Sequence, residues 1–112
     1  MLKHLNAFIT LDAERVLEAA RAADARRTKG EPLGPLYGLP LAIKDNIDTS
    51  GVLTTAGTAA LKQHRPRADA AVLAPLYAAG AILLGKTNLH ELGYGYTTNN
   101  GAFGPTRSES VV

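Results

Sequence analysis

The sequence predicts a single α/β unit in which helices alternate with short strands. Three observations indicate this: an amphipathic helical pattern early in the chain, two short apolar runs of strand length, and a second helical pattern between those runs. When a helix connects two strands of one sheet, the strands become parallel neighbours. The 112 residues are enough for one small domain with a modest core, or for part of a larger domain.

The first element is an amphipathic helix over residues 11–29. Thr10 is its expected N-cap, and Gly30 followed by Pro32 is expected to end it. Charged residues occupy the opposite face, so we interpret the helix as a packing element with no chemistry of its own. Its apolar stripe consists of Ala13, Val16, Leu17, Ala20 and Ala23.

Two strands are expected at residues 39–44, "LPLAIK", and residues 81–86, "AILLGK". Runs that are apolar on both faces are typical of strands in a sheet that is covered on both sides. Turn-forming residues follow the first strand, and residues 48–61 are expected to be irregular with a short helix. Residues 88–95 are expected to contain one helical turn.

Residues 69–79, "DAAVLAPLYAA", predict the helix between the two strands. Asp69 is the candidate N-cap, and Gly80 is the expected residue after the helix end. Pro75 would remove one hydrogen bond and clash with the preceding turn, so we expect a kink there.

Composition excludes several classes of function. The net charge of +2 is too small, and too evenly mixed along the chain, to indicate direct binding of nucleic acid. No apolar run is long enough for a membrane span, and no signal peptide is evident, so a cytoplasmic protein is expected. Without cysteine there is no thiolate chemistry, and His4, His64 and His90 have no companion ligands. We therefore expect no metal and no cofactor.

Residues 80–87, "GAILLGKT", match the pattern of a phosphate-binding loop. Such a loop follows a strand, and its residues between the glycines curl so that their N–H groups face the phosphate. Here these residues are apolar and suit a buried strand, and a helical pattern precedes the first glycine. We conclude that the match does not indicate nucleotide binding.

Lys44 is the residue whose position is most unusual, because it directly follows an expected buried strand. Lysine is almost never fully buried without a partner, and burial lowers the pKa of a lysine until its neutral amine can act as a general base. Asp45 and Asn46 follow at once and could hydrogen-bond the turn. Residue chemistry alone leaves open that Lys44 points to solvent at a strand end.

Four segments decide the interpretation: "GPLYGLPLAIKDNID", "TTAGTAAL", "DAAVLAPLYAAGAILLGKTNLHEL" and "NNGAFGPTR". In order and spacing they resemble the amidase signature family, which includes bacterial amidases and the A subunit of glutamyl-tRNA amidotransferase. The resemblance covers residues 5–107. It implies an α/β/α fold with a mixed sheet, and hydrolysis or transfer of the amide of a small carboxamide by a Ser–cis-Ser–Lys triad.

The resemblance also implies roles for individual residues. Lys44 matches the triad base, which takes a proton from the nucleophilic serine through a bridging serine. The positions implied to shape the site or bind substrate are Asp45, Asn46, Asn99, Asn100 and Gly101. The positions implied to be structural polar groups are Lys86, Asn88 and Glu91.

The sequence departs from the family pattern after Arg107, where the family continues into a Gly-Ser-rich segment that carries a catalytic serine. Ser50, Ser108 and Ser110 match neither serine of the triad. We therefore expect residues 1–112 to be the N-terminal part of an amidase domain, incomplete on its own and inactive when isolated. Its expected partners are a small amide substrate and either the remainder of the amidase chain or a second copy.

Two alternatives remain open. One is a short, non-catalytic binding or assembly module derived from an amidase. The other is a part of the A subunit of the amidotransferase. The segments "LKQHRPRADA" and "NLHELGYG" favour a free-standing amidase over an amidotransferase component.

Overall fold

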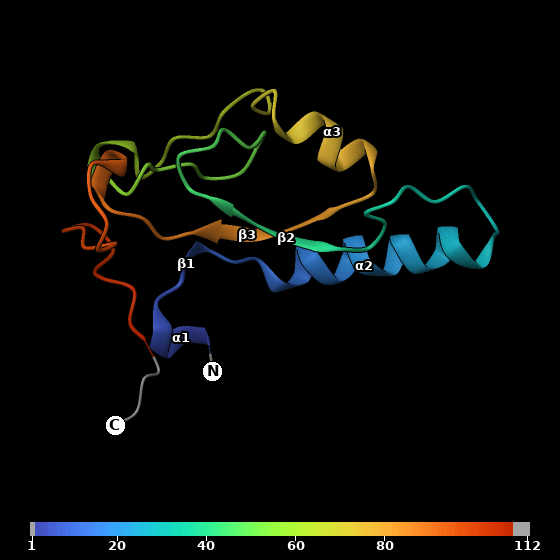
Figure 1. The fold of residues 1–112 in the computed structure, drawn as a ribbon, viewed down its shortest axis with the longest axis horizontal. Helices are drawn as coiled ribbons and strands as arrows, with labels where there is room; N and C mark the ends of the chain where they lie inside the picture. Colours follow the sequence, from blue (N-terminus) through green and yellow to red (C-terminus); the bar gives the residue numbers. More distant parts are fainter. Residues whose placement is uncertain (1, 109–112) are drawn as a thin grey trace.

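A computed structural model of the protein describes residues 2–108, which contain a mixed three-stranded sheet in the order β1-β3-β2 (Figure 1). β2 (Pro40–Lys44) and β3 (Ile82–Thr87) lie parallel, as the helix–strand order predicts. β1 (Phe8–Thr10) pairs antiparallel with β3 and makes the sheet mixed, as the family resemblance implies. The sequence pattern does not predict β1, because three residues are too few to show an alternation.

β3 contains a bulge where it pairs with β2. Leu41 pairs with Leu83, and the next residue, Ala42, pairs with Gly85, so Leu84 is an extra residue in the ladder. From there the register continues with Ile43 opposite Lys86 and Lys44 opposite Thr87. Gly85 also lies where β1 passes closely, since an added Cβ would be 2.7 Å from the carbonyl oxygen of Thr10.

Three α-helices and two short 3-10 turns surround the sheet: α1 (Leu2–Leu5), α2 (Ala13–Thr28), α3 (Leu73–Ala78), η1 (Ala59–Leu61) and η2 (Glu91–Gly93). η1 confirms the short helix expected within residues 48–61, whereas η2, within residues 88–95, contains Leu92 with a non-helical φ of 55° and is not a regular helical turn. In the view of Figure 1, α2 runs along one side of the strands, and α3 lies on the other side. No helix in the described part of the chain is long and apolar enough to cross a membrane.

α2 confirms the predicted amphipathic helix but differs from it in two details. Its N-cap is Asp12, whose side chain accepts a hydrogen bond from the N–H of Arg15 at 3.1 Å, whereas Thr10 belongs to β1. Only part of the predicted stripe faces the sheet, and Leu17 is 53% exposed. The half-buried members of the stripe are Val16, Ala20 and Ala23, and no residue of α2 is fully buried.

α3 is shorter than predicted. Asp69 is not its N-cap, because the carboxylate accepts a hydrogen bond from the N–H of Ser50 at 2.8 Å, and the helix begins at Leu73. The expected kink is therefore also wrong: Pro75 lies in the first turn, where the missing N–H would have had no helical partner. Gly80 follows the helix end as predicted, with a positive φ of 96°.

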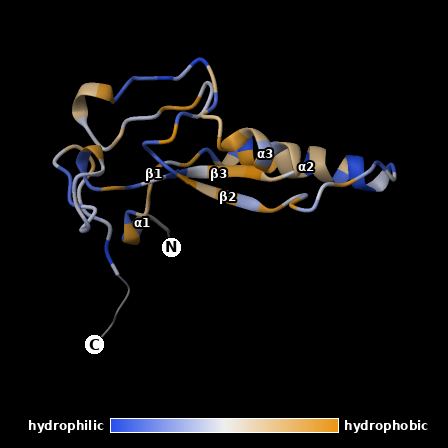
Figure 2. Ribbon diagram, turned by 45° about the horizontal axis from the view of Figure 1, so that its top comes forward, coloured by the Kyte–Doolittle hydropathy of each residue, from blue (hydrophilic) through white to orange (hydrophobic). Residues whose placement is uncertain are grey.

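Most of the buried residues of the described chain are polar, and most of them lie in β2, in β3 or in the segments that follow these strands. Figure 2 shows hydrophobic colouring along much of β3 and hydrophilic colouring at the far end of α2. The buried apolar residues are Ile43, Val52, Leu73, Ala81 and Leu89. The buried polar residues are Asp45, Thr49, Thr54, Thr55, Thr58, Lys86, Asn88 and Asn100. β2 is not buried on both faces as predicted, since Pro40, Ala42 and Lys44 are exposed.

Candidate functional site

The candidate residues gather at one end of the sheet, the edge where the carboxyl ends of β2 and β3 lie. Because β2 and β3 are parallel and Lys44 pairs with Thr87, both strands end at the same place. Asp45 and Asn46 follow β2 directly, and Asn88 follows β3. In open α/β sheets, ligands bind outside the carboxyl ends of the strands, so this edge is where a site is expected.

Lys44 has a fixed backbone and a free side chain. Its carbonyl oxygen accepts a hydrogen bond from the N–H of Ile47 at 3.0 Å, which closes a tight turn. Its side chain is exposed, and within residues 2–108 it makes no hydrogen bond or ion pair. Of the two alternatives that residue chemistry left open, the described chain shows the one in which Lys44 points to solvent, because the face of β2 that carries Lys44, opposite to Ile43, is left uncovered.

The buried lysine is Lys86, which is 0% exposed. Its Nζ donates to the carbonyl oxygen of Ile47 at 2.9 Å and to Oγ1 of Thr54 at 2.8 Å. It also lies 3.5 Å from Oδ1 of Asp45, in an ion pair whose two side chains are both fully buried. Burial lowers the pKa of Lys86, and the neighbouring Asp45 carboxylate opposes that shift.

Asp45 is held through both its side chain and its backbone. Its Oδ2 accepts hydrogen bonds from the N–H of Thr55 at 3.0 Å and from the hydroxyl of Thr55 at 2.5 Å. Its N–H donates to the carbonyl oxygen of Thr87 at 3.1 Å, and its own carbonyl oxygen accepts from the N–H of Ala56 at 2.9 Å. Only Oδ1 lacks a hydrogen bond and has the Lys86 charge as its neighbour.

Asn100 is a buried residue that ties a loop to the end of β3. Its side-chain amide donates to Oδ1 of Asn88 at 2.8 Å and to the carbonyl oxygen of Leu89 at 2.9 Å. Asn88 in turn donates to the carbonyl oxygens of Asn6 and Gly104, at 3.2 Å and 2.9 Å. This network gives Asn88 the structural role that the resemblance implies, and it brings residues 99–101 close to the end of β3.

The remaining candidate positions are exposed. Asn46 lies in the turn after Lys44, and its Nδ2 would be 3.5 Å from a Cβ added at Gly93. Asn99 and Gly101 flank the buried Asn100, and a Cβ added at Gly101 would contact nothing within 4 Å. The structure therefore brings Asn46 and Asn100 to the same end of the sheet as Lys44, without a direct contact to its amine.

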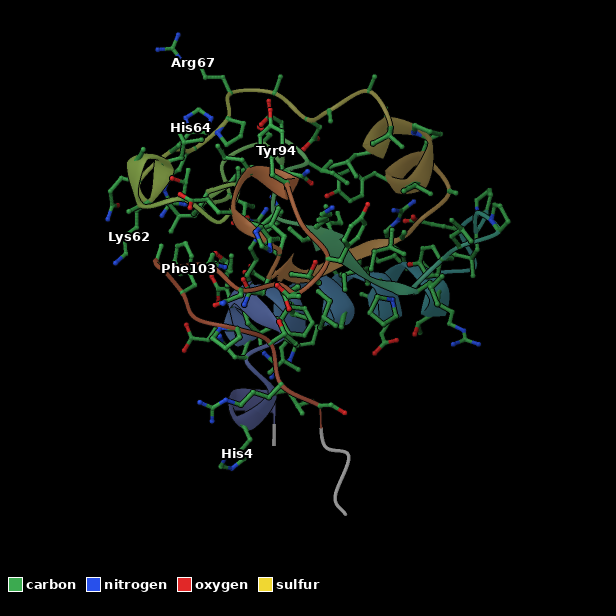
Figure 3. All side chains as sticks on the ribbon, turned by 60° about the vertical axis from the view of Figure 1, so that its left-hand side comes forward. His4, Lys62, His64, Arg67, Tyr94 and Phe103 are labelled. Carbon is green, nitrogen blue, oxygen red and sulfur yellow. The ribbon has the colours of Figure 1, made fainter. Side chains whose placement is uncertain are left out.

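Within the described range, no cluster of three or more His, Cys, Asp or Glu side chains is placed to hold a metal ion. The histidines illustrate this, because His4 and His64 project at opposite ends of the molecule (Figure 3).

Lys62 lies beside the ring of Phe103, with 5.9 Å between its Nζ and the ring centroid.

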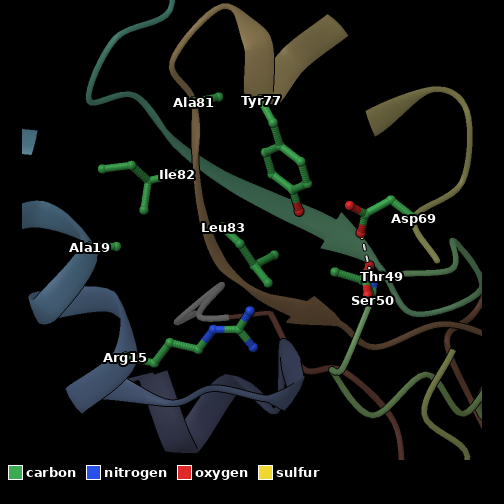
Figure 4. A pocket seen from close by; sticks show the side chains of 9 residues that line it. All are labelled: Arg15, Ala19, Thr49, Ser50, Asp69, Tyr77, Ala81, Ile82 and Leu83. Carbon is green, nitrogen blue, oxygen red and sulfur yellow. Dashed lines mark hydrogen bonds between the residues drawn. The ribbon is translucent and has the colours of Figure 1, made fainter. Parts of the chain in front are cut away.

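A cavity of about 260 Å³ lies between α2, β3 and α3 (Figure 4). Arg15 and Asp69 contribute its charged groups, and Asp69 accepts a hydrogen bond there from the N–H of Ser50. None of the candidate residues lines this cavity. Lys44 therefore lies outside this cavity, at the carboxyl end of β2.

The model of the amidase family matches residues 1–108. The chain belongs to the amidase family. The A subunit of glutamyl-tRNA(Gln) amidotransferase from Salinispora arenicola is 50% identical over 104 residues, which are 93% of this chain and 21% of that protein. Its counterpart from Desulforapulum autotrophicum is 51% identical, with the same coverage. The chain thus spans about a fifth of the length of these curated relatives.

Solved structures of amidases share the fold. The peptide amidase of Stenotrophomonas maltophilia is 39% identical, with a TM-score of 0.81 over 92% of this chain and 22% of that enzyme. A protein from a vestigial complex, studied for the origins of an s-triazine catabolic enzyme, is 47% identical, with a TM-score of 0.83 over 92% of this chain and 23% of its own length.

Sequence reasoning missed the two threonines that complete the buried cluster. Thr54 and Thr55 form hydrogen bonds with Lys86 and Asp45, respectively. In the sequence, a threonine in a buried cluster of this kind cannot be distinguished from a threonine in an ordinary turn. The available signal was the place of these threonines in "TTAG", a segment that the family resemblance already included.

Proposed function

We propose that this protein hydrolyses a carboxamide to a carboxylate and ammonia, and that Lys44 is the base of its Ser–cis-Ser–Lys triad. Membership of the amidase family supports the reaction class. The position of Lys44 at the end of β2, where ligand sites of α/β sheets lie, supports its role.

The observation that carries the assignment is the difference between the two lysines at this edge. Lys86 is buried and uses its ammonium group for three interactions, so it has no freedom to exchange a proton with a substrate. Lys44 has an anchored backbone and an amine without any partner in the described chain. A base needs a fixed position and an amine that no other group engages, and within the described chain Lys44 meets these conditions.

In the proposed mechanism the neutral amine of Lys44 accepts the proton of a bridging serine, as that serine takes the proton of the nucleophilic serine. The nucleophile adds to the amide carbon, and collapse of the tetrahedral intermediate expels ammonia, which receives the proton back. Water then hydrolyses the acyl-enzyme. Both serines and the oxyanion-hole donors would come from residues outside this sequence.

The test is ammonia release from simple carboxamides by the natural gene product that contains this sequence. Removing a general base costs about 10²–10⁴-fold in rate, so Lys44→Ala is expected to lower kcat/KM by that factor while the circular dichroism spectrum stays unchanged. Lys29→Ala, which removes an exposed lysine at the C-cap of α2, is the matched control and is expected to retain the rate. Full activity in Lys44→Ala would reject the assignment.

The isolated 112-residue chain is expected to release no ammonia, because it contains no serine that matches the triad. A natural gene product of 11.8 kDa without amidase activity would instead support a non-catalytic binding or assembly module.

A second candidate function is that of the A subunit of a glutamyl-tRNA(Gln) amidotransferase, favoured by identities of 46–51% to relatives of that name. Ammonia release from simple amides by the purified protein alone supports a free-standing amidase. Amide transfer to glutamyl-tRNA that requires further protein components supports the amidotransferase.

A further inference from the structure

The proposed mechanism does not use Lys86, although its burial is costly. Two charges removed from water lose several kcal/mol of hydration each, and an apolar pair of similar volume is often equally stable. A buried pair is therefore weak evidence for stability alone. What distinguishes the pair of Lys86 and Asp45 is its contact with the turn that carries Lys44.

The contacts of Lys86 converge on the turn that carries Lys44. The carbonyl oxygen of Ile47 accepts from Lys86 at 2.9 Å, and the N–H of the same residue donates to the carbonyl oxygen of Lys44 at 3.0 Å. Lys86 thus holds the residue that closes the turn, on the far side of the strand from the Lys44 side chain.

Lys86 also restrains Asp45, the residue next to Lys44. The Oδ1 atom of Asp45 has no hydrogen bond, and the ammonium group at 3.5 Å is its only charged partner within the described residues. Without Lys86 this oxygen would remain buried with no partner, and the carboxylate could regain one only by moving. Because Thr55 binds the other oxygen, that movement would be transmitted to the segment at residues 54–56.

We propose that Lys86 and Asp45 together act as a positioning unit for Lys44. They fix the Lys44 backbone from the opposite face of the sheet, so that its free amine stays in one position relative to the bridging serine. This inference rests on the proposed function, because it concerns the placement of the same base. A displacement of about 1 Å at a catalytic group can cost on the order of 10²-fold in rate, so positioning is measurable.

The experiment compares kcat and KM of variants of the natural gene product, assayed at a temperature where each remains folded. Lys86→Met removes the tether and leaves Asp45 charged. The double variant Lys86→Met/Asp45→Asn removes both charges, so no buried charge remains unpaired and the fold is recovered. Leu73→Ala, at a buried apolar site in α3, serves as a control that lowers stability and removes none of the hydrogen bonds of the turn.

Lys86→Met is expected to lower kcat by about 10–10²-fold with little change in KM. The double variant is expected to regain thermal stability but not kcat, since the tether to Ile47 is still missing. Leu73→Ala is expected to lose stability and keep kcat. If Lys86→Met does not fold, the kcat of the double variant decides the question.

The inference is overturned if folded Lys86→Met keeps the wild-type kcat, or if kcat returns together with stability in the double variant. Lys44→Ala separates this failure from failure of the proposed function. Loss of activity in Lys44→Ala with unchanged kcat in Lys86→Met rejects only the positioning role. Retained activity in Lys44→Ala rejects the proposed function itself.

Discussion

Helix α2 and the irregular segment at residues 45–58 contribute very differently to the interior of this protein. α2 is the longest regular element of the described chain, with a clear amphipathic pattern, yet none of its residues is fully buried. The irregular segment contains five of the eight buried polar residues found in the described chain, and the buried Val52. Regularity of pattern and contribution to the core are thus separate properties in this chain.

The difference follows from where the backbone groups find their partners. A helix satisfies its own N–H and C=O groups, so α2 needs the sheet only for its apolar side chains. An irregular segment has to satisfy its backbone through other contacts, and here threonine hydroxyls, a carboxylate and a lysine supply them. Its polar side chains are buried because they replace the hydrogen bonds of regular structure.

The largest difference in stability between the two regions is expected from Lys86→Met. Leaving a buried carboxylate without its partner costs about 3–5 kcal/mol, so the free energy of unfolding is expected to fall by that amount. Leu17→Ala on the exposed side of α2 is the matched control and is expected to stay within about 0.5 kcal/mol of wild type. Urea unfolding of the natural gene product measures both, and equal losses would contradict the comparison.

A smaller effect is expected from Thr55→Val, which keeps the shape and removes the hydroxyl. That hydroxyl donates to Asp45 and accepts from the N–H of Gly57, so its loss is expected to cost about 1–3 kcal/mol. The control is Thr28→Val, because Thr28 also makes a side-chain hydrogen bond, at an exposed position in α2. Thermal unfolding should separate the two variants, and a larger loss in Thr28→Val would reverse our interpretation.

The smallest effect is expected from Asp12→Ala, which removes the N-cap of α2. Loss of such a cap costs about 1 kcal/mol, and it tests how much this helix depends on its own ends. Asp24→Ala, within the same helix, is the control and is expected to change little. The unfolding midpoint is the measurement, and a cost for Asp12→Ala above that of Lys86→Met would show that α2 dominates stability.

Much of the fold could be predicted from the sequence. Apolar runs located β2 and β3, and the helical pattern between them fixed their parallel direction. The ends of the helices could not be predicted from the sequence: Thr10 and Asp69 were the expected N-caps, but Thr10 belongs to β1, and Asp69 accepts a hydrogen bond from Ser50, a residue 19 positions away. β1 could not be predicted, because its three residues show no local pattern and form a strand only through pairing with β3.

The candidate site was predictable only in part. The family resemblance located Lys44 and its neighbours, whereas the lysine that the fold buries is Lys86. Hydropathy patterns cannot separate two lysines that each follow an apolar run. The distinction depends on which face of the sheet residues 47–55 cover, and that is a tertiary contact over about 30–40 positions.

The bulge at Leu84 decides which of the two lysines is buried. If Leu84 paired with Ala42, the ladder would continue unshifted, and Lys86 would pair with Lys44 on one face of the sheet. Two ammonium groups would then stand side by side and repel each other. The bulge shifts the register by one residue, so Lys86 pairs with Ile43 and faces Asp45, whereas Lys44 lies on the opposite face. The different environments of the two lysines thus follow from a single shift of register.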